Sequence, residues 1–444
     1  MAYVTQSLAS GDKLPVIENA PQSDLQGKDH DMPKRLMGRM LLPAFAALLA
    51  IPATAQVPPG ANLGSLGQPG PATIRPDYAR TRAVVSPIIH PDRRVTFRLN
   101  APEATDVRIT GHVIGANMHW LSKERSLPMT KGADGFWSIT LGPLEPEIYP
   151  YNYLVNGVAA SDPGNRINMV EVPGNAPAYY DPQNVPHGDV RMVVYNSKAT
   201  NSVRYLRVYT PPGYDESKER YPVLYLQHGG NCCEYSWMEQ ARANMIMDNL
   251  IAQKKARPMI VVMALGARSG PSEALGPVPS QMEGAKPPAG RQSNYDPGNL
   301  FEQDLLTGII PFIDRKFRTL ANADNRALSG LSQGGIQTVT IGLRHTDTFH
   351  WLVPMSAGAE NTGDDQFMKI SEDIFANPEP LKKNLKLLYF LVGREDVLYE
   401  PDKRLAEKLQ SLGIKLTFTA YPGMHEYKVW RRGLYETAPL LFRN

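Results

Sequence analysis

Apolar and polar positions alternate with a period of two between residues 86 and 180. The runs 95–99, 137–141 and 149–155 each place apolar side chains at every second position. A period of two puts those side chains on one face of a β-strand. The pair Asn156-Gly157 follows the last run, and Asn-Gly favours a tight hairpin turn. This stretch therefore predicts a small all-β sandwich domain.

The pattern changes after about residue 190, where short apolar runs alternate with longer amphipathic ones. The expected strands are residues 222–229, 258–265, 325–329, 351–356, 385–393 and 415–423. The expected helices are residues 238–255, 300–317, 335–345 and 401–412, followed by a C-terminal helix. Such alternation is typical of a mostly parallel sheet flanked by helices. The sequence predicts an α/β domain over 190–444, preceded by the all-β domain.

Two segments are rich in proline and glycine. Residues 56–85 have the composition of a linker. Residues 266–299 form a connection that is unusually long for a compact domain. Loops of this length often have a functional role, so we expect a lid or rim at this point.

Residues 32–55 have the three parts of a secretory signal peptide. Basic residues lie at 34–39, an apolar core follows at 40–51, and residues 53–55 read Ala-Thr-Ala. The apolar core is too short for a membrane span. We therefore expect a secreted or periplasmic protein. Residues 1–31 carry no such pattern, and we expect translation to begin after them.

Composition excludes several classes of protein. The chain has 444 residues, of which 42% are apolar and 20% charged, with a net charge of +3. This is ordinary globular composition, and the absence of a Lys/Arg block argues against a nucleic-acid partner.

The cysteines are the adjacent Cys232 and Cys233. They exclude a disulfide framework, and we expect two buried thiols. The sequence has no phosphate-binding loop, dinucleotide or zinc motif, so no cofactor or metal is expected.

The segment Gly330-Leu331-Ser332-Gln333-Gly334 matches the pattern Gly-x-Ser-x-Gly. It lies between an expected strand and an expected helix. In this context the pattern predicts a tight turn that presents the serine hydroxyl, while the flanking glycines give the backbone room. Ser332 is the candidate nucleophile.

A serine nucleophile needs a base, and His425 is the candidate. It follows the last expected strand and comes after Ser332 in the chain. His345 and His350 lie too soon after Ser332, on the helix or loop that follows it. The order Ser, acid, His is typical of this kind of triad.

The acid is expected after a strand between Ser332 and His425. Asp396 follows the strand 385–393, with Glu395 as its immediate competitor and Asp364 and Asp365 as weaker ones. The acid would hold the imidazole in one tautomer and stabilise the imidazolium.

Backbone amides are expected to stabilise the tetrahedral intermediate. The amide of Gln333 is one candidate donor, and Gly230, after the strand 222–229, is the other. The neighbouring His228 is expected to be structural. Trp237, Tyr399 and Trp430 lie near these loops. They would either line the pocket for a sugar or aryl acid or pack in the core.

Five segments resemble the esterase D-like hydrolases of carbohydrate esterase family 1, which includes feruloyl and acetylxylan esterases. They are YPVLYLQHGG, EYSWMEQARANMIMDNLIA, RALSGLSQGG, LVGREDVLYE and YPGMHEYKVWRRGLYETAPLLF. Residues 86–180 resemble the Ig-like early-set domain that precedes such esterases. The resemblance implies an α/β-hydrolase fold. It also implies a triad of Ser332, Asp396 and His425, with oxyanion donors at Gly230 and Gln333.

The resemblance implies a serine carboxylic-ester hydrolase that works through an acyl-enzyme without metal or cofactor. The expected partner is a feruloyl or acetyl ester of plant cell-wall polysaccharide, or a small-molecule ester. Alternatives are a siderophore ester of the enterobactin type, acyl transfer to an acceptor other than water, and a non-catalytic carbohydrate-binding protein.

Overall fold

The computed structural model describes residues 85–115, 125–165, 167–230, 233–266, 298–358 and 372–443. Every described residue belongs to one compact unit, Gly70–Asn444. The signal expected at 32–55, nearly all of the linker at 56–85 and most of the connection at 266–299 lie outside the described residues.

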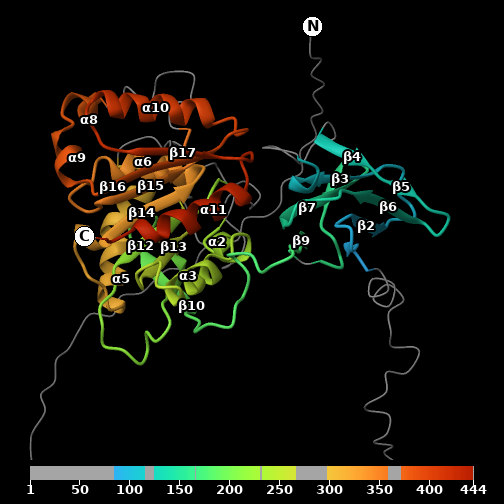
Figure 1. Ribbon diagram of the computed structural model, residues 1–444, viewed down its shortest axis with the longest axis horizontal. Coiled ribbons are helices and arrows are strands. Elements are labelled where there is room, and N and C mark those ends of the chain that lie inside the picture. Colours follow the sequence, from blue (N-terminus) through green and yellow to red (C-terminus); the bar gives the residue numbers. More distant parts are fainter. Residues whose placement is uncertain are drawn as a thin grey trace, which may run out of the picture. The chain divides into compact units, whose positions relative to one another are not determined.

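Residues 88–172 form two antiparallel sheets (Figure 1). The strand orders are β1-β2-β6-β5 and β4-β3-β7-β8, with β9 paired to β7. The strands are β1 (Ile88–Ile89), β2 (Val95–Asn100), β3 (Val107–Gly111), β4 (Ser126–Pro128), β5 (Thr130–Lys131), β6 (Phe136–Leu141), β7 (Glu147–Val155), β8 (Val158–Ala160) and β9 (Met169–Val172). Phe97 of β2 meets Tyr151 of β7 with ring centroids 4.8 Å apart. The inward positions of both sheets therefore share one core, as the period of two predicts.

An eight-stranded sheet follows, in the order β10-β11-β13-β12-β14-β15-β16-β17. Its strands are β10 (Asp189–Ser197), β11 (Ser202–Thr210), β12 (Val223–Gln227), β13 (Ile260–Ala264), β14 (Arg326–Leu331), β15 (Trp351–Met355), β16 (Leu387–Gly393) and β17 (Thr417–Tyr421). The strands from β12 to β17 are parallel, which confirms the predicted α/β arrangement. The antiparallel hairpin β10–β11 was not among the expected elements. All residues of β12, β13 and β15 are buried, because parallel strands are covered on both faces.

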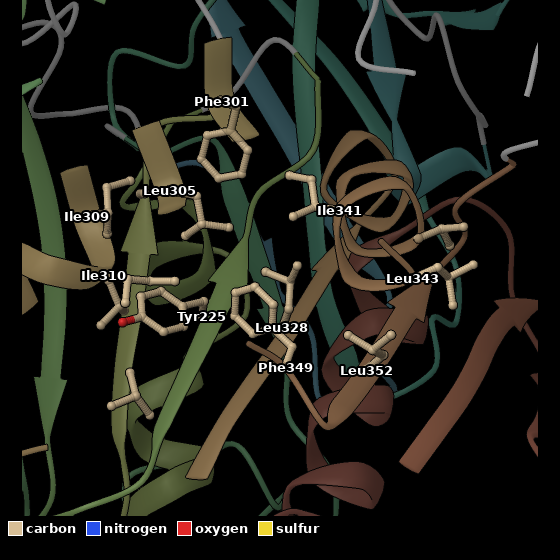
Figure 2. Close-up of a cluster of buried hydrophobic side chains, with 14 of the residues drawn as sticks. Tyr225, Phe301, Leu305, Ile309, Ile310, Leu328, Ile341, Leu343, Phe349 and Leu352 are labelled. Carbon is tan, nitrogen blue, oxygen red and sulfur yellow. The ribbon is translucent and has the colours of Figure 1, made fainter. Parts of the chain in front are cut away.

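Helices cover both faces of this sheet (Figure 1). One face packs against α4 (Leu300–Asp304), η6 (Leu305–Ile309), α5 (Ile310–Lys316), α6 (Gln333–Gly342), α8 (Glu372–Ala376), α9 (Glu379–Asn384) and α10 (Tyr399–Ser411). The other face packs against α2 (Ser236–Glu239), α3 (Ala243–Ala252) and α11 (Tyr427–Thr437). Figure 2 shows part of the first core, in which Tyr225 and Leu328 from the sheet belong to the same cluster as Leu305 and Ile309. Burial of these side chains is the main force that holds the layers together.

Two expected helices are interrupted. The helix expected at 238–255 is two helices, because Arg242 adopts a left-handed backbone with φ 53° between α2 and α3. The carbonyl of Gln240, in the same break, accepts a hydrogen bond from Arg431 instead of continuing the helix. The helix expected at 300–317 contains the π-helical turn η6 in its middle. Tertiary contacts of this kind leave no periodic signal in the sequence.

A buried ion pair links the antiparallel region to α11. Glu147 of β7 accepts a hydrogen bond from the Arg431 guanidinium, and the two side chains are 8% and 1% exposed. The guanidinium also lies over the ring of Tyr180, 4.7 Å from its centroid. Removing one member of such a pair leaves a buried charge without its partner.

We expect Glu147→Gln to lower the free energy of unfolding by about 3–5 kcal/mol. Urea unfolding of the full chain, followed by circular dichroism, measures the change. The matched control is Glu436→Gln, which breaks the partly exposed Arg432–Glu436 pair on the same helix. The control should cost about 0.5 kcal/mol or less. Equal losses in the two variants would contradict the importance of the buried pair.

Candidate active site

The candidate residues gather where the parallel strands end. Ser332 follows β14 directly, Asp396 lies three residues after β16, and His425 lies four residues after β17. Gly229 and Gly230 follow β12. Parallel neighbours have their carboxyl ends at the same edge of a sheet, so the topology brings these loops together.

Ser332 lies in a strained turn between β14 and α6. Its φ is 52° and its ψ is −116°, a region that residues with a Cβ rarely adopt. A Cβ on Gly330 would lie 2.6 Å from the backbone of Gly334. A Cβ on Gly334 would lie 2.7 Å from the carbonyl oxygen of Gln227. Both glycines of the motif are therefore required for the close approach of β14, α6 and β12.

Asp396 and His425 form a hydrogen-bonded pair. The Nδ1 of His425 lies 2.9 Å from one carboxylate oxygen of Asp396 and 3.2 Å from the other. The Asp396 side chain is fully buried, and one oxygen also accepts the amide of Leu398 at 2.9 Å. Glu395 is exposed and accepts the amide of Gly423 instead. The geometry therefore favours Asp396 over Glu395 as the partner of His425. Asp364 and Asp365 lie outside the described residues.

The turn after β12 lies beside the serine turn. A Cβ on Gly229 would lie 3.4 Å from the Cβ of Ser332, and one on Gly230 would lie 3.4 Å from the Gln333 side chain. Gln333 is the first residue of α6. The two segments expected to carry the oxyanion donors are thus adjacent. Cys233 is only half-buried, so the expectation of a buried thiol is wrong there, and Cys232 lies outside the described residues.

His228 is structural, as expected. The amide of Gly266 donates to its Nε2 at 2.8 Å, and its Nδ1 lies 2.6 Å from the carbonyl oxygen of Gly229. Because Nε2 of His228 accepts a hydrogen bond, the ring proton is on Nδ1. The neutral ring therefore bridges two loops.

The three candidate aromatic residues differ in their surroundings. Trp237 is 1% exposed and donates its Nε1–H to the carbonyl of Gln227, so it packs in the core rather than lining an open pocket. Trp430 is also buried, and its ring meets the His425 ring at 4.8 Å in an edge-to-face arrangement. The buried Trp430 ring therefore packs against His425 from the interior of the protein. Tyr399 is half-buried at the start of α10 and contacts Phe418.

The antiparallel region contacts the histidine loop. His112, in the short 3-10 turn η2 (His112–Ile114), has its Nδ1 3.9 Å from a carboxylate oxygen of Glu426. Burial lowers the pKa of His112. A Cβ on Gly115 would lie 3.7 Å from the methyl carbon of Met424. Residues 112–115 therefore lie directly against the two neighbours of His425.

Asp402 is a buried carboxyl group that the sequence did not reveal. It lies in the first turn of α10 and accepts the amides of Ala357 and Gly358 at 2.9 and 2.7 Å. Burial raises the pKa of Asp402 to about 8, and the negative charge of Asp396 adds to the rise. An acidic residue in the first turn of a helix is common, so its sequence position carried no distinctive signal.

No three or more His, Cys, Asp or Glu side chains are grouped to hold a metal ion in the part of the chain that the structure describes. Within those same residues, no helix is long and apolar enough to cross a membrane.

The strand order, the serine turn and the Asp396–His425 pair define an α/β-hydrolase. Residues 197–441 match the family model "Esterase", and the chain belongs to this family of carboxylic ester hydrolases. The chain is 31% identical over 373 residues to an endo-1,4-beta-xylanase/feruloyl esterase of Xylanibacter ruminicola. That alignment covers 80% of this chain and 46% of the relative, so the chain spans about half of the relative's length.

A solved structure shares the fold of this chain. The enterobactin esterase of Shigella flexneri, solved in the presence of enterobactin, has a TM-score of 0.56 and 16% identity. The match covers 78% of this chain and 92% of that one. A ferulic acid esterase of Anaeromyces mucronatus has a TM-score of 0.48 and 22% identity, over 60% of this chain and 96% of that one.

The raised pKa of Asp402 predicts a stability difference that depends on pH. Its folded-state pKa of about 8 exceeds the ordinary value of 3.8, so the folded protein binds the proton more tightly. This stabilisation is complete below about pH 4 and is lost as the pH rises toward about 8. Asp402→Asn has no such loss.

Melting temperatures measured from about pH 4 to about pH 9 test this. The melting temperature of Asp402→Asn minus that of the wild type should rise with pH and level off above about pH 8. The control Glu400→Gln changes an exposed carboxylate on the same helix and should give a constant difference. A constant difference for Asp402→Asn as well would contradict the raised pKa.

Proposed function

We propose that the chain is a serine esterase in which Ser332 is the nucleophile, His425 the base and Asp396 the orienting acid. The observation that carries the proposal is the bond between His425 and the buried Asp396, at the same sheet edge as the strained Ser332 turn. Asp396 accepts from Nδ1–H of His425, which leaves Nε2 to accept the serine proton.

The mechanism has two half-reactions. The Ser332 oxygen bonds to the ester carbonyl carbon while its proton passes to His425, and the tetrahedral intermediate then expels the alcohol, which takes that proton. Water, deprotonated by His425, next attacks the acyl carbon. The second tetrahedral intermediate then breaks its bond to the Ser332 oxygen, which takes the proton back from His425 as the acid leaves. The backbone amides of Gln333 and Gly230 are the proposed oxyanion donors. Their adjacent segments and the α6 N-terminus support this assignment.

The proposed substrate is a feruloyl ester of plant cell-wall polysaccharide, with acetyl esters as the nearest variant. The support is the 31% identity to a relative named as both xylanase and feruloyl esterase. Such a polysaccharide cannot enter a cell, so the proposal includes export through the signal expected at 32–55. Export is tested by comparing the secreted and cell-bound amounts of chains with and without this segment.

A siderophore ester is the second candidate substrate. The observation in its favour is the fold match to the enterobactin esterase, which extends over 78% of this chain. At 16% identity this supports the fold only. The proposed export argues against a siderophore, because iron is released from such complexes inside the cell.

Ser332→Ala is the first test of the function. Removing the nucleophile should lower kcat by roughly 10⁴–10⁶ with little change in melting temperature. The assay compares methyl ferulate, 4-nitrophenyl acetate and an enterobactin ester, each with and without an alcohol acceptor. Release of ferulate by the wild type alone supports the full proposal. Cleavage of 4-nitrophenyl acetate alone would instead support acetyl esters as the substrate. Hydrolysis by folded Ser332→Ala would refute the mechanism.

Asp396→Asn tests the acid. The amide favours the wrong tautomer of His425, so kcat/KM should fall by about 10⁴. Glu395→Gln is the matched control, because Glu395 is adjacent but exposed, and its activity should stay near that of the wild type. Full activity of Asp396→Asn together with loss in Glu395→Gln would reverse the assignment.

A further inference from the structure

The segment Ser356–Gly358 directly follows β15, whose last residue holds the serine turn. The amide of Ser332 donates to the carbonyl of Met355, the last residue of β15, at 2.9 Å. The amide of Ser356 donates to Leu391 of β16 at 2.7 Å. The Ser356 hydroxyl oxygen accepts the Nε1–H of Trp430 at 2.9 Å. Met355 and Ser356 together therefore connect the serine turn with the ring that packs against His425.

Close packing leaves this segment no room to shift. A Cβ on Gly335, in the first turn of α6, would lie 2.6 Å from the Met355 carbonyl oxygen and 2.9 Å from the Cα of Ala357. Gly358 has φ 57°, and a Cβ there would lie 2.7 Å from the Leu398 side chain. Small displacements of the segment would consequently move α6 or the loop that carries Asp396.

Asp402 fixes this segment through its backbone. One carboxylate oxygen accepts the amide of Ala357 and the other accepts the amide of Gly358. The Asp402 side chain is buried, and its own amide donates to Leu398, two residues after Asp396. The carboxyl group thus holds two successive amides of the segment from a helix that begins beside the proposed acid.

We propose that Asp402 is a positioning residue for ester hydrolysis. By holding Ser356–Gly358 it keeps Ser356 in reach of Trp430, and Trp430 in turn keeps the His425 ring aligned with Asp396. This inference rests on the proposed function. An aspartate suits the task because each of its two carboxyl oxygens faces one of the two amides, whereas an asparagine would set its NH2 donor against one of them.

The ionisation of Asp402 adds an electrostatic effect. Its pKa of about 8 lies in the range where esters are assayed, and among the described residues the negative charge of Asp396 opposes its ionisation. The contacts from Ser356–Gly358 to Asp402 are backbone amides. As the pH rises through about 8, a second negative charge appears beside Asp396. That charge repels the carboxylate of Asp396, the partner of His425.

Asp402→Asn is the decisive variant, assayed on 4-nitrophenyl acetate and methyl ferulate. A misplaced His425 should lower kcat by about 10- to 100-fold while KM changes little, because substrate binding does not involve Asp402. The ionisation near pH 8 should also disappear from the profile of kcat/KM against pH. Glu400→Gln, exposed on the same helix, should behave as the wild type in both respects.

Ser356→Ala provides an independent measurement. It removes the acceptor of the Trp430 Nε1–H but keeps both amides that bind Asp402. It should show the same loss in kcat without a change in KM, and it decides the question if Asp402→Asn does not fold. Folded variants with unchanged kcat and unchanged pH profile would overturn the positioning role while leaving Ser332-dependent hydrolysis intact. Wild-type hydrolysis that survives Ser332→Ala would instead refute the proposed function.

Discussion

At Ser332 the chain leaves a parallel strand and enters a helix within one residue, with φ 52° and ψ −116°. Such a backbone costs free energy, on the order of 1–3 kcal/mol, and persists only where its surroundings hold it in place. Here Gly330 and Gly334 have no Cβ, so β14, α6 and β12 can pack more closely than a larger residue would allow. The amide of Ser332 is held by the carbonyl of Met355. The rest of the site is arranged around the position that this turn gives the serine.

The supports of the site come from several elements. Asp396 is placed by the amide of Leu398, and His425 is placed by Asp396 on one side and the Trp430 ring on another. The antiparallel region reaches the same loop through His112 and is tied to α11 through the Glu147–Arg431 pair. The antiparallel region therefore contacts both the loop that carries the proposed base and the helix that follows it.

The sequence was sufficient for the parts of the molecule that local patterns determine. The period of two predicted β2, β6 and β7, and the Gly-x-Ser-x-Gly context predicted β14, the serine turn and α6. Asp396 was predicted from chain order, and in the structure its carboxylate is hydrogen-bonded to His425. Asp402 could not be found in this way, because its partners lie 45 and 44 residues earlier. The break at Arg242 likewise depends on a tertiary contact, the hydrogen bond from Arg431 to Gln240.

Covalent trapping tests the central claim most directly. A fluorophosphonate reacts with an activated serine, whose oxygen displaces fluoride, and the adduct can be located by peptide mass spectrometry. The account predicts a single adduct on Ser332 of the folded chain, and a much slower reaction in Asp396→Asn because the histidine tautomer is wrong. An adduct on another residue, or a folded wild-type chain that forms none, would contradict the account.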